Sequence, residues 1–281
     1  MFDREKIDKK NIPNDFYHCV ITIINVKAKK NVEWPKSSEW LSHRLDLFEQ
    51  YCYPSIMGQS IKNFEWLVFF HEDSIDESNM KRILSYEFLT PVFISGTKFF
   101  TRYNIINYLT KHKKLSKKKF LITTNVDSDD SIHKNFIKDI QNKHFKRQEF
   151  EIINFSLGYR YFYEDKTPWL FNWWGNSLFT MIEKIPSNPK NLKTSRYVYS
   201  HAEICRVLFR KNVKNIVTEE PYFFQVIHDS NIQQLYREGD RWRSLVKGAK
   251  NKKVNLTKNE VKEKFNIDVD FEENFNKYSK K

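Results

Sequence analysis

The feature that most constrains the fold is an alternation of short apolar runs with longer amphipathic stretches, from His18 to about Glu164. The short runs are rich in β-branched and aromatic residues, which strands favour. The stretches between them carry apolar residues at steps of three and four, the spacing of one helical face. A chain that alternates strand and helix in this way builds βαβ units around a largely parallel sheet. We therefore expect an α/β fold.

The same patterns place the individual elements. Strands are predicted over 18–26, 64–70, 91–95, 120–126, 196–200 and 221–228. Helices are predicted over 38–56, 74–84, 103–111 and 130–144, with a further helix after residue 200. Ser74 or Asp76 is the expected cap of the second helix, and Asp130 that of the fourth. The aromatic-rich segment 149–185 lacks helical spacing, so we expect short antiparallel strands and loops there.

Composition limits the classes of protein that remain. With 281 residues, 40% of them hydrophobic, the chain can bury a substantial core, and we expect one domain over 14–230. The lysine-rich segment 231–281 is expected to be a peripheral basic extension, helical or partly disordered. Residues 1–13 are strongly charged, which argues against a secretory signal, and no later segment approaches a membrane-spanning length. Three scattered cysteines exclude a disulfide framework and a zinc knuckle, so a cytoplasmic protein is expected.

The charge balance is strongly basic, with 48 Lys and Arg against 35 Asp and Glu and a formal net charge of +13. Such an excess suits an anionic partner, but a Lys- and Asn-rich vocabulary alone also produces it. The densest cluster is formed by lysines 111, 113, 114, 117, 118 and 119. This lysine cluster precedes the strand at 120–126, so it should lie at the edge of the sheet opposite the strand's carboxyl end. A solvated loop is the simpler interpretation, and a surface for the inner face of a membrane or for nucleic acid is the alternative.

An acidic run, Asp127, Ser128, Asp129 and Asp130, directly follows the strand that ends at Val126. Ligands of open α/β sheets bind at the carboxyl ends of strands. Asp127 and Asp129 would point to one side of an extended chain and could share Mg²⁺ or Mn²⁺, which would neutralise a diphosphate leaving group. The alternative is a turn that caps the next helix. Three adjacent carboxylates repel one another without a cation, however, and a cap needs only Asp130.

Other candidates for donor binding follow from position. Lys98 and Arg102 follow the third predicted strand, at the same sheet edge as the acidic run, and could contact phosphates or a pyrimidine base. Arg44 lies on the first predicted helix, where a solvated or salt-bridged arginine is the default and a diphosphate contact the alternative. Gly175 and Asn176 follow an aromatic stretch and could let the backbone approach the donor closely.

Three stretches resemble a known family, the putative rhamnosyl transferases, which have a GT-A-like glycosyltransferase core. They are WLSHRLDLFEQYCYPSIMGQSIKNFEWLVFF, LITTNVDSDDSIHKNFI and FFQVIHDSN, over residues 40–70, 121–137 and 223–231. The resemblance implies a Rossmann-type mixed sheet flanked by helices, with a small antiparallel extension. It also implies that the acidic run is a DxD metal motif, with Asp127 and Asp129 as ligands of Mn²⁺ or Mg²⁺ and His228 as a third ligand. From the sequence pattern alone, His228 would be a buried imidazole.

The resemblance further implies transfer of a hexose or deoxyhexose, with L-rhamnose among the options, from a nucleoside diphosphate sugar to a hydroxyl of a polysaccharide or glycolipid. An inverting enzyme would need a general base, for which we select Glu203, with Asp130 as a second catalytic candidate. Two alternatives stay open. One is a glycosyltransferase that acts on modified bases of DNA, which the basic surface would suit. The other is a non-catalytic nucleic-acid-binding protein whose acidic run is only a turn.

Overall fold

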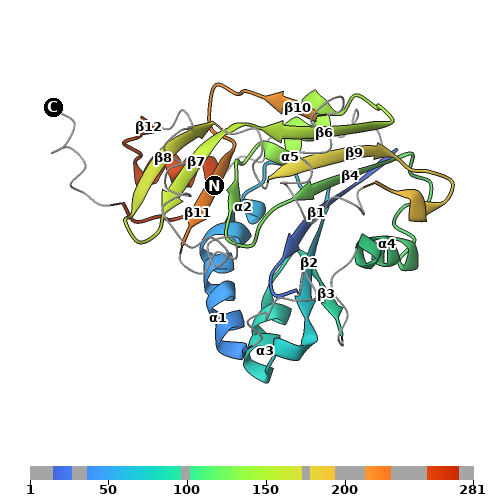
Figure 1. Cartoon of the computed structure of the whole chain (residues 1–281), viewed down its shortest axis with the longest axis horizontal. Coiled ribbons are helices and arrows are strands. Elements are labelled where there is room, and N and C mark those ends of the chain that lie inside the picture. The colour runs from blue at the N-terminus through green and yellow to red at the C-terminus, as the bar shows by residue number, and fades with distance from the viewer. Residues whose placement is uncertain are drawn as a thin grey trace, which may run out of the picture.

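The computed structural model describes residues 15–26, 37–95, 102–172, 178–193, 213–228 and 252–271. Two mixed sheets are flanked by helices (Figure 1). This confirms the expected fold class, a mixed sheet with helices on its faces and a smaller extension. The predictions for a strand over 196–200 and the helix after it lie outside the described residues.

The larger sheet contains seven strands in the order β10-β6-β9-β4-β1-β2-β3. Their bounds are β1 Phe16–Ile23, β2 Glu65–His71, β3 Leu89–Ile94, β4 Phe120–Asn125, β6 Phe150–Phe155, β9 Phe179–Lys184 and β10 Val213–Ile216. Strands β1 to β4 are mutually parallel where they pair, whereas β9 is antiparallel to both β4 and β6. The chain lays β2 and β3 on one side of β1 and β4 on the other. The carboxyl ends of β1 and β4 therefore form a topological switch point, the place where open α/β sheets bind ligands.

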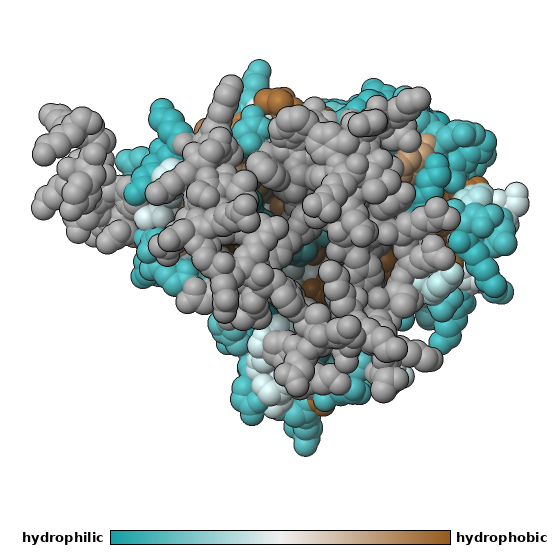
Figure 2. All heavy atoms as spheres, in the orientation of Figure 1, coloured by the Kyte–Doolittle hydropathy of each residue, from teal (hydrophilic) through white to brown (hydrophobic). Residues whose placement is uncertain are grey.

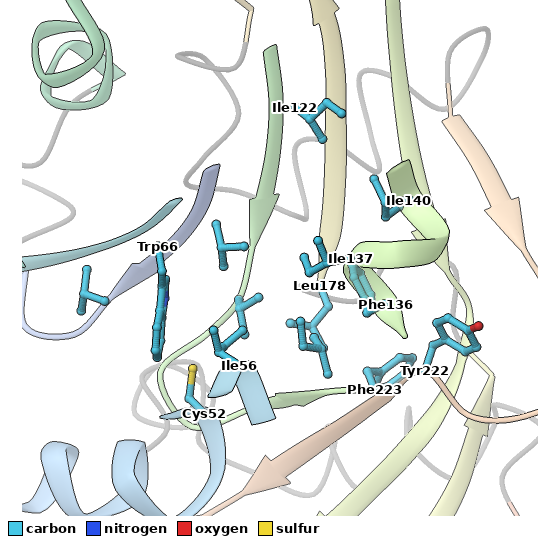
Figure 3. Close-up of a cluster of buried hydrophobic side chains, with 14 of the residues drawn as sticks. Cys52, Ile56, Trp66, Ile122, Phe136, Ile137, Ile140, Leu178, Tyr222 and Phe223 are labelled. Carbon is cyan, nitrogen blue, oxygen red and sulfur yellow. The ribbon is translucent and has the colours of Figure 1, made fainter. Parts of the chain in front are cut away.

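Helices cover both faces of this sheet. One face carries α1 (Ser38–Leu47), η1 (Phe48–Cys52), α2 (Tyr53–Met57), α3 (Glu77–Ser85), α5 (Phe136–Asp139) and η3 (Ile140–His144). Figure 3 shows this core, in which Cys52, Trp66 and Phe136 lie with other buried side chains between the helices and the sheet. The opposite face carries α4 (Arg102–Lys111), which packs Ile105 and Leu109 against the sheet. Alternate side chains of β1 point to opposite faces of the sheet, so they pack into the two hydrophobic cores in turn, as the period of two in a strand requires.

The predicted helix 38–56 is one continuous helical segment with a wide turn in its middle. Ser37 caps it by accepting a hydrogen bond from the backbone N–H of Trp40 (3.1 Å). The π-helical turn η1 ends at Cys52, two residues before Pro54. Proline has no N–H to donate and its ring crowds the preceding turn, so the backbone widens there instead of keeping regular i to i−4 bonds. The segment ends at Gly58.

A second, five-stranded sheet extends the molecule in the order β12-β8-β7-β11-β5. Its strands are β5 Ser131–Ile132, β7 Leu157–Phe162, β8 Thr167–Asn172, β11 Phe223–Ile227 and β12 Lys252–Lys253. The β7 and β8 pair is antiparallel, which confirms the expectation for the aromatic-rich segment. Two 3-10 turns, η2 (Glu72–Ser74) and η4 (Pro189–Asn191), complete the described elements with the C-terminal helix.

The predicted helix 130–144 is only partly correct. After the acidic run the chain forms β5, whose Ser131 and Ile132 pair with β11, and helical structure begins only at Phe136. Asp130 therefore caps no helix, and Asn135 precedes the helix without a side-chain cap bond. The second helix does carry the predicted cap, because Asp76 accepts a hydrogen bond from the Asn79 backbone N–H (2.8 Å).

Part of the segment 231–281 is helical, as expected, but this helix is packed against the rest of the protein and is not peripheral. Helix α10 (Lys258–Phe265) begins with a capping box between Thr257 and Glu260 and ends at Asn266 in the left-handed conformation. Val261 and Phe265 are fully buried in a cluster that also contains Tyr51 and Phe224. Asn266 donates a side-chain hydrogen bond to the Pro54 carbonyl (2.7 Å). The helix thus docks onto the helical segment α1–η1–α2 and the second sheet.

A buried polar network centred on His18 crosses the large sheet. The Gln141 amide donates to His18 Nδ1 (3.0 Å), so Nε2 carries the proton and donates to Thr124 Oγ1 (2.9 Å), which bonds Thr180 Oγ1 (2.8 Å). Burial lowers the pKa of His18 to about 3, because water cannot stabilise the imidazolium there.

This network predicts a pH-dependent stability. In the unfolded chain the pKa of His18 is about 6.5. The stabilisation that neutral, buried His18 gives the folded state is therefore fully present above pH 6.5 and is lost as the pH falls toward 3. Between about pH 6 and 4 the free energy of unfolding should fall by roughly 1 kcal/mol per pH unit from this residue. Urea denaturation across this range measures how the free energy of unfolding changes with pH. In the wild type the change should correspond to uptake of about one proton on unfolding, and His18→Gln should remove it. Equal slopes in the two proteins would contradict this role.

The lysine cluster lies at the amino-terminal edge of the large sheet, as predicted. Lys114 pairs with Glu65 at the start of β2 (2.8 Å), and the Lys119 backbone N–H bonds the Asp15 carbonyl just before β1 (2.7 Å). The described residues on the face in Figure 2 are mostly hydrophilic. In the part of the chain that the structure describes, none of the helices has the length and apolar character needed to span a membrane.

Candidate functional site

The acidic run forms a tight turn at the switch point. The Val126 backbone N–H bonds the Ile21 carbonyl of β1 (3.0 Å), so the run leaves β4 beside the end of β1. The Asp130 backbone N–H then bonds the Asp127 carbonyl (3.2 Å), which closes a four-residue turn. Ser128, Asp129 and Asp130 are buried and Asp127 is half-buried. The run therefore forms a turn, but it caps no helix, and the Ser128, Asp129 and Asp130 side chains are buried at the carboxyl end of β4.

Helix α1 places the positively charged side chain of Arg44 against this turn. Arg44 is only 6% exposed, and its Nη1 lies 3.1 Å from Asp129 Oδ2 while its Nη2 donates to Ser128 Oγ (2.6 Å). The guanidinium also lies 5.9 Å from the ring centroid of Trp40, one turn earlier on the same helix. An arginine held by two side chains of one turn has a fixed orientation. Of the two default interpretations of Arg44, the structure has the salt bridge and not the solvated side chain, and its contact with a donor diphosphate stays a prediction.

His228 reaches the same carboxylate from the second sheet. It directly follows β11, is 3% exposed, and its Nε2 lies 2.9 Å from Asp129 Oδ2. An ionised carboxylate oxygen can only accept, so Nε2 carries the proton and donates to it. The 3.3 Å separation of Arg44 Nη1 and His228 Nε2 is then a contact between two donors. Arg44, Asp129 and His228 thus connect α1, the exit of β4 and the exit of β11 in one buried triad.

The electrostatics of Asp129 are set by this triad. Burial alone would raise the pKa of the Asp129 carboxyl, but the Arg44 charge and the His228 hydrogen bond outweigh it and hold the pKa below its usual range. Asp129 is therefore ionised at neutral pH. A buried carboxylate is tolerated only where charge and hydrogen bonds compensate it, and both are present.

Asp130 has a different environment. Its Oδ1 accepts a hydrogen bond from the Val226 backbone N–H of β11 (3.0 Å), and the residue is 2% exposed. Arg160 of β7 supplies favourable charge to it, while Arg160 itself stacks 3.5 Å from the Phe171 ring centroid and donates to Gln225 Oε1 (2.7 Å). The described contact of Asp130 therefore joins the acidic turn to the second sheet.

Sequence reasoning missed a polar pair at the neighbouring strand exits. Asn25, just after β1, donates from its amide to the His71 carbonyl (3.1 Å) and accepts from the His71 backbone N–H (2.9 Å). Both residues are buried at the carboxyl ends of β1 and β2. The available signal was a polar residue within or directly after an apolar run, as in INV and FFH. This pair fixes the ends of two strands beside the acidic turn.

The predicted site residues divide into three groups. The structure brings Arg44, Asp129 and His228 into direct contact, with Asp127 and Asp130 on the same turn. Arg102 is the first residue of α4, and its side chain is not described. Lys98, Gly175, Asn176 and the proposed base Glu203 lie outside the described residues. Their roles stay predictions.

The side chains as placed do not fit a divalent cation. Two of the three residues expected to bind the metal, Asp129 and His228, contact each other through Oδ2 and Nε2, and both atoms contact the Arg44 guanidinium. A second cation at that oxygen would be repelled by the guanidinium. Within the described residues, no three His, Cys, Asp or Glu side chains are grouped so that they could hold a metal ion.

Comparison with known proteins finds one family and several similar solved structures. The model of the family described as "Putative rhamnosyl transferase" matches residues 27–237. No curated protein sequence matches the chain. Among solved structures, a "putative nucleotide-diphospho-sugar transferase" from Desulfovibrio desulfuricans G20 has a TM-score of 0.35 and 9% identity, covering 82% of this chain and 94% of that one. TarS of S. aureus has a TM-score of 0.35 and 15% identity over 75% and 60%, and HddC of Yersinia pseudotuberculosis 0.39 and 11% over 80% and 99%.

Proposed function

Because this chain belongs to the family described as "Putative rhamnosyl transferase" and is a glycosyltransferase, we propose that it uses a nucleoside diphosphate sugar as donor. The sugar would be a hexose or deoxyhexose, with L-rhamnose among the options, and the acceptor a hydroxyl of a polysaccharide or glycolipid. The observation that carries this proposal is the buried triad of Arg44, Asp129 and His228 at the switch point of a parallel sheet.

The triad supports a donor site at this edge for a physical reason. Glycosyl transfer from a nucleoside diphosphate builds negative charge on the leaving diphosphate, which needs fixed positive charge and N–H donors around it. Arg44 provides a guanidinium whose planar fork matches phosphate oxygens. Ser128 and Asp129 hold that fork in place, so less side-chain entropy would be lost when an anion binds.

A glycan acceptor is favoured over a modified base of DNA. The lysine cluster, the densest part of the basic surface that would suit DNA, lies at the amino-terminal edge of the sheet, where Lys114 and Lys119 contact the starts of β2 and β1. The triad lies at the carboxyl edge, on the other end of the same strands. A DNA duplex bound by the lysine cluster would therefore lie at the opposite end of the strands from the triad.

Donor binding is the test of this proposal. Purified protein is heated with dTDP-, UDP- and GDP-sugars, each with and without Mn²⁺, and with free sugars and nucleoside monophosphates as controls. One class of nucleotide sugar should raise the melting temperature by about 5 °C, since ligand at 100 times Kd stabilises by about 2.7 kcal/mol. Release of nucleoside diphosphate from that donor then reports turnover. If no nucleotide sugar changes the melting temperature at millimolar concentration under either condition, the proposal fails.

A further inference from the structure

We propose that Arg44 takes the place of the divalent cation, so that this glycosyltransferase binds the donor diphosphate without a metal ion. The inference rests on the proposed donor and concerns how its charge is compensated. Its starting point is the charge of the acidic turn. Three adjacent carboxylates would need a cation, and the protein itself supplies two: Arg44 at Asp129 and Arg160 near Asp130.

The geometry of Arg44 points to a further anionic ligand. A guanidinium carries five N–H donors in a fixed plane. Nη1 donates to Asp129 and Nη2 to Ser128, whereas the buried Nε–H has no acceptor among the described residues. A buried N–H without an acceptor is costly, by about 1–3 kcal/mol. Arg44 is only 6% exposed, so this N–H donor is buried at the switch point.

The supports around Arg44 orient the guanidinium as well as neutralising charge. Asp129 accepts from both Arg44 Nη1 (3.1 Å) and His228 Nε2 (2.9 Å), so the carboxylate is fixed from two sides. Ser128 fixes the second arm of the fork at 2.6 Å. A carboxylate held in this way serves as the anchor of an arginine, and the same oxygen is unsuitable for a metal ion beside that arginine. Asp129 and His228 are therefore positioning residues for Arg44.

The test compares nucleoside diphosphate binding in the two metal conditions. UDP, dTDP and GDP are each titrated into the full-length protein in EDTA and, separately, in 1 mM Mn²⁺, with the melting temperature and calorimetric Kd as readouts. The diphosphate that binds should do so with Kd values that agree within threefold in the two conditions. Mn²⁺ alone should produce no melting shift. Binding that appears only with Mn²⁺ overturns the inference and leaves the proposed function intact, whereas absence of binding in both conditions overturns both.

A variant pair tests Arg44 itself. Arg44→Lys keeps a positive charge but loses the planar fork, so Kd for the diphosphate in EDTA should rise at least tenfold. Arg82→Lys is the matched control, because Arg82 also bridges two acidic residues, Asp46 and Glu49, but does so between α3 and the α1–η1 segment, where both carboxylates are exposed (2.7 Å each). Its Kd should equal that of the wild type. Equal Kd values for Arg44→Lys and the wild type would overturn the role of the planar fork. The comparison of EDTA with Mn²⁺ uses only the wild-type protein, so it tests the inference even if Arg44→Lys does not fold.

Discussion

Replacing Arg44 by methionine should lower the free energy of unfolding by about 3–5 kcal/mol, a large part of the stability of an ordinary domain. The reason is the Asp129 carboxylate, which has a side chain only 8% exposed and would lose its main counter-charge. Equilibrium urea denaturation at pH 7 measures the effect. The double variant Arg44→Met/Asp129→Asn should recover part of the loss, because the uncompensated charge is then gone.

The control for this prediction is Arg82→Met. Asp46 and Glu49, the partners of Arg82, have side chains that are 64% and 41% exposed, so water replaces the lost arginine and the cost should stay within about 1 kcal/mol. If Arg44→Met cost no more than Arg82→Met, the Arg44–Asp129 pair would not be a desolvated pair. If the two single changes in the double variant were additive, the residues would not be energetically coupled.

Much of the large sheet could be predicted because its signals are local. The run at 64–70 predicts a buried strand on its own, and β2 spans Glu65–His71. The stripe of apolar residues in 38–56 predicts a helix whose inward face is Leu41, Leu45 and Phe48, all fully buried in the structure. Burial on one face follows from periodicity alone, so neither element depended on knowing its partners.

The errors occur where distant partners override local patterns. Ser131 and Ile132 were assigned to a helix, but they pair with Phe224 and Phe223 of β11, about ninety residues later in the chain. A strand pairing of that range leaves no mark in the local spacing of residues. The segment 258–265 was expected to be peripheral because lysines and glutamates dominate its composition. Val261 and Phe265, four residues apart on one helical face, are nevertheless buried in the structure.

The candidate site shows the same division. The position of the acidic turn follows from the end of β4, because strand ends are local features. The contact between Arg44 and Asp129 joins residues 85 positions apart, and only the fold brings them together. A usable clue was present, because Arg44 lies between Leu41 and Leu45 on the buried stripe of its helix. A charged residue inside such a stripe needs a buried partner, and an acidic turn at a sheet edge is the natural one.

The C-terminal helix α10 should contribute strongly to stability, and Phe265→Ala measures this contribution. Phe265 is fully buried, with ring centroids 5.7 Å from Phe224 and 6.0 Å from His133. Removing a buried phenylalanine ring costs about 3–5 kcal/mol, because the transfer free energy of the ring is lost and a cavity remains. Urea denaturation should show this loss as a single transition with a lower midpoint.

Glu263→Ala on the same helix separates packing from helix propensity. Glu263 pairs with Lys134 at 3.2 Å and its side chain is 75% exposed, so its removal should change the free energy of unfolding by less than about 1 kcal/mol. A peripheral α10 would give two small and similar effects. A loss of several kcal/mol for Phe265→Ala alone would instead mean that β7, β11 and the helical segment α1–η1–α2 need α10 to complete their core, because Tyr51, Tyr159 and Phe224 would otherwise expose apolar surface to water.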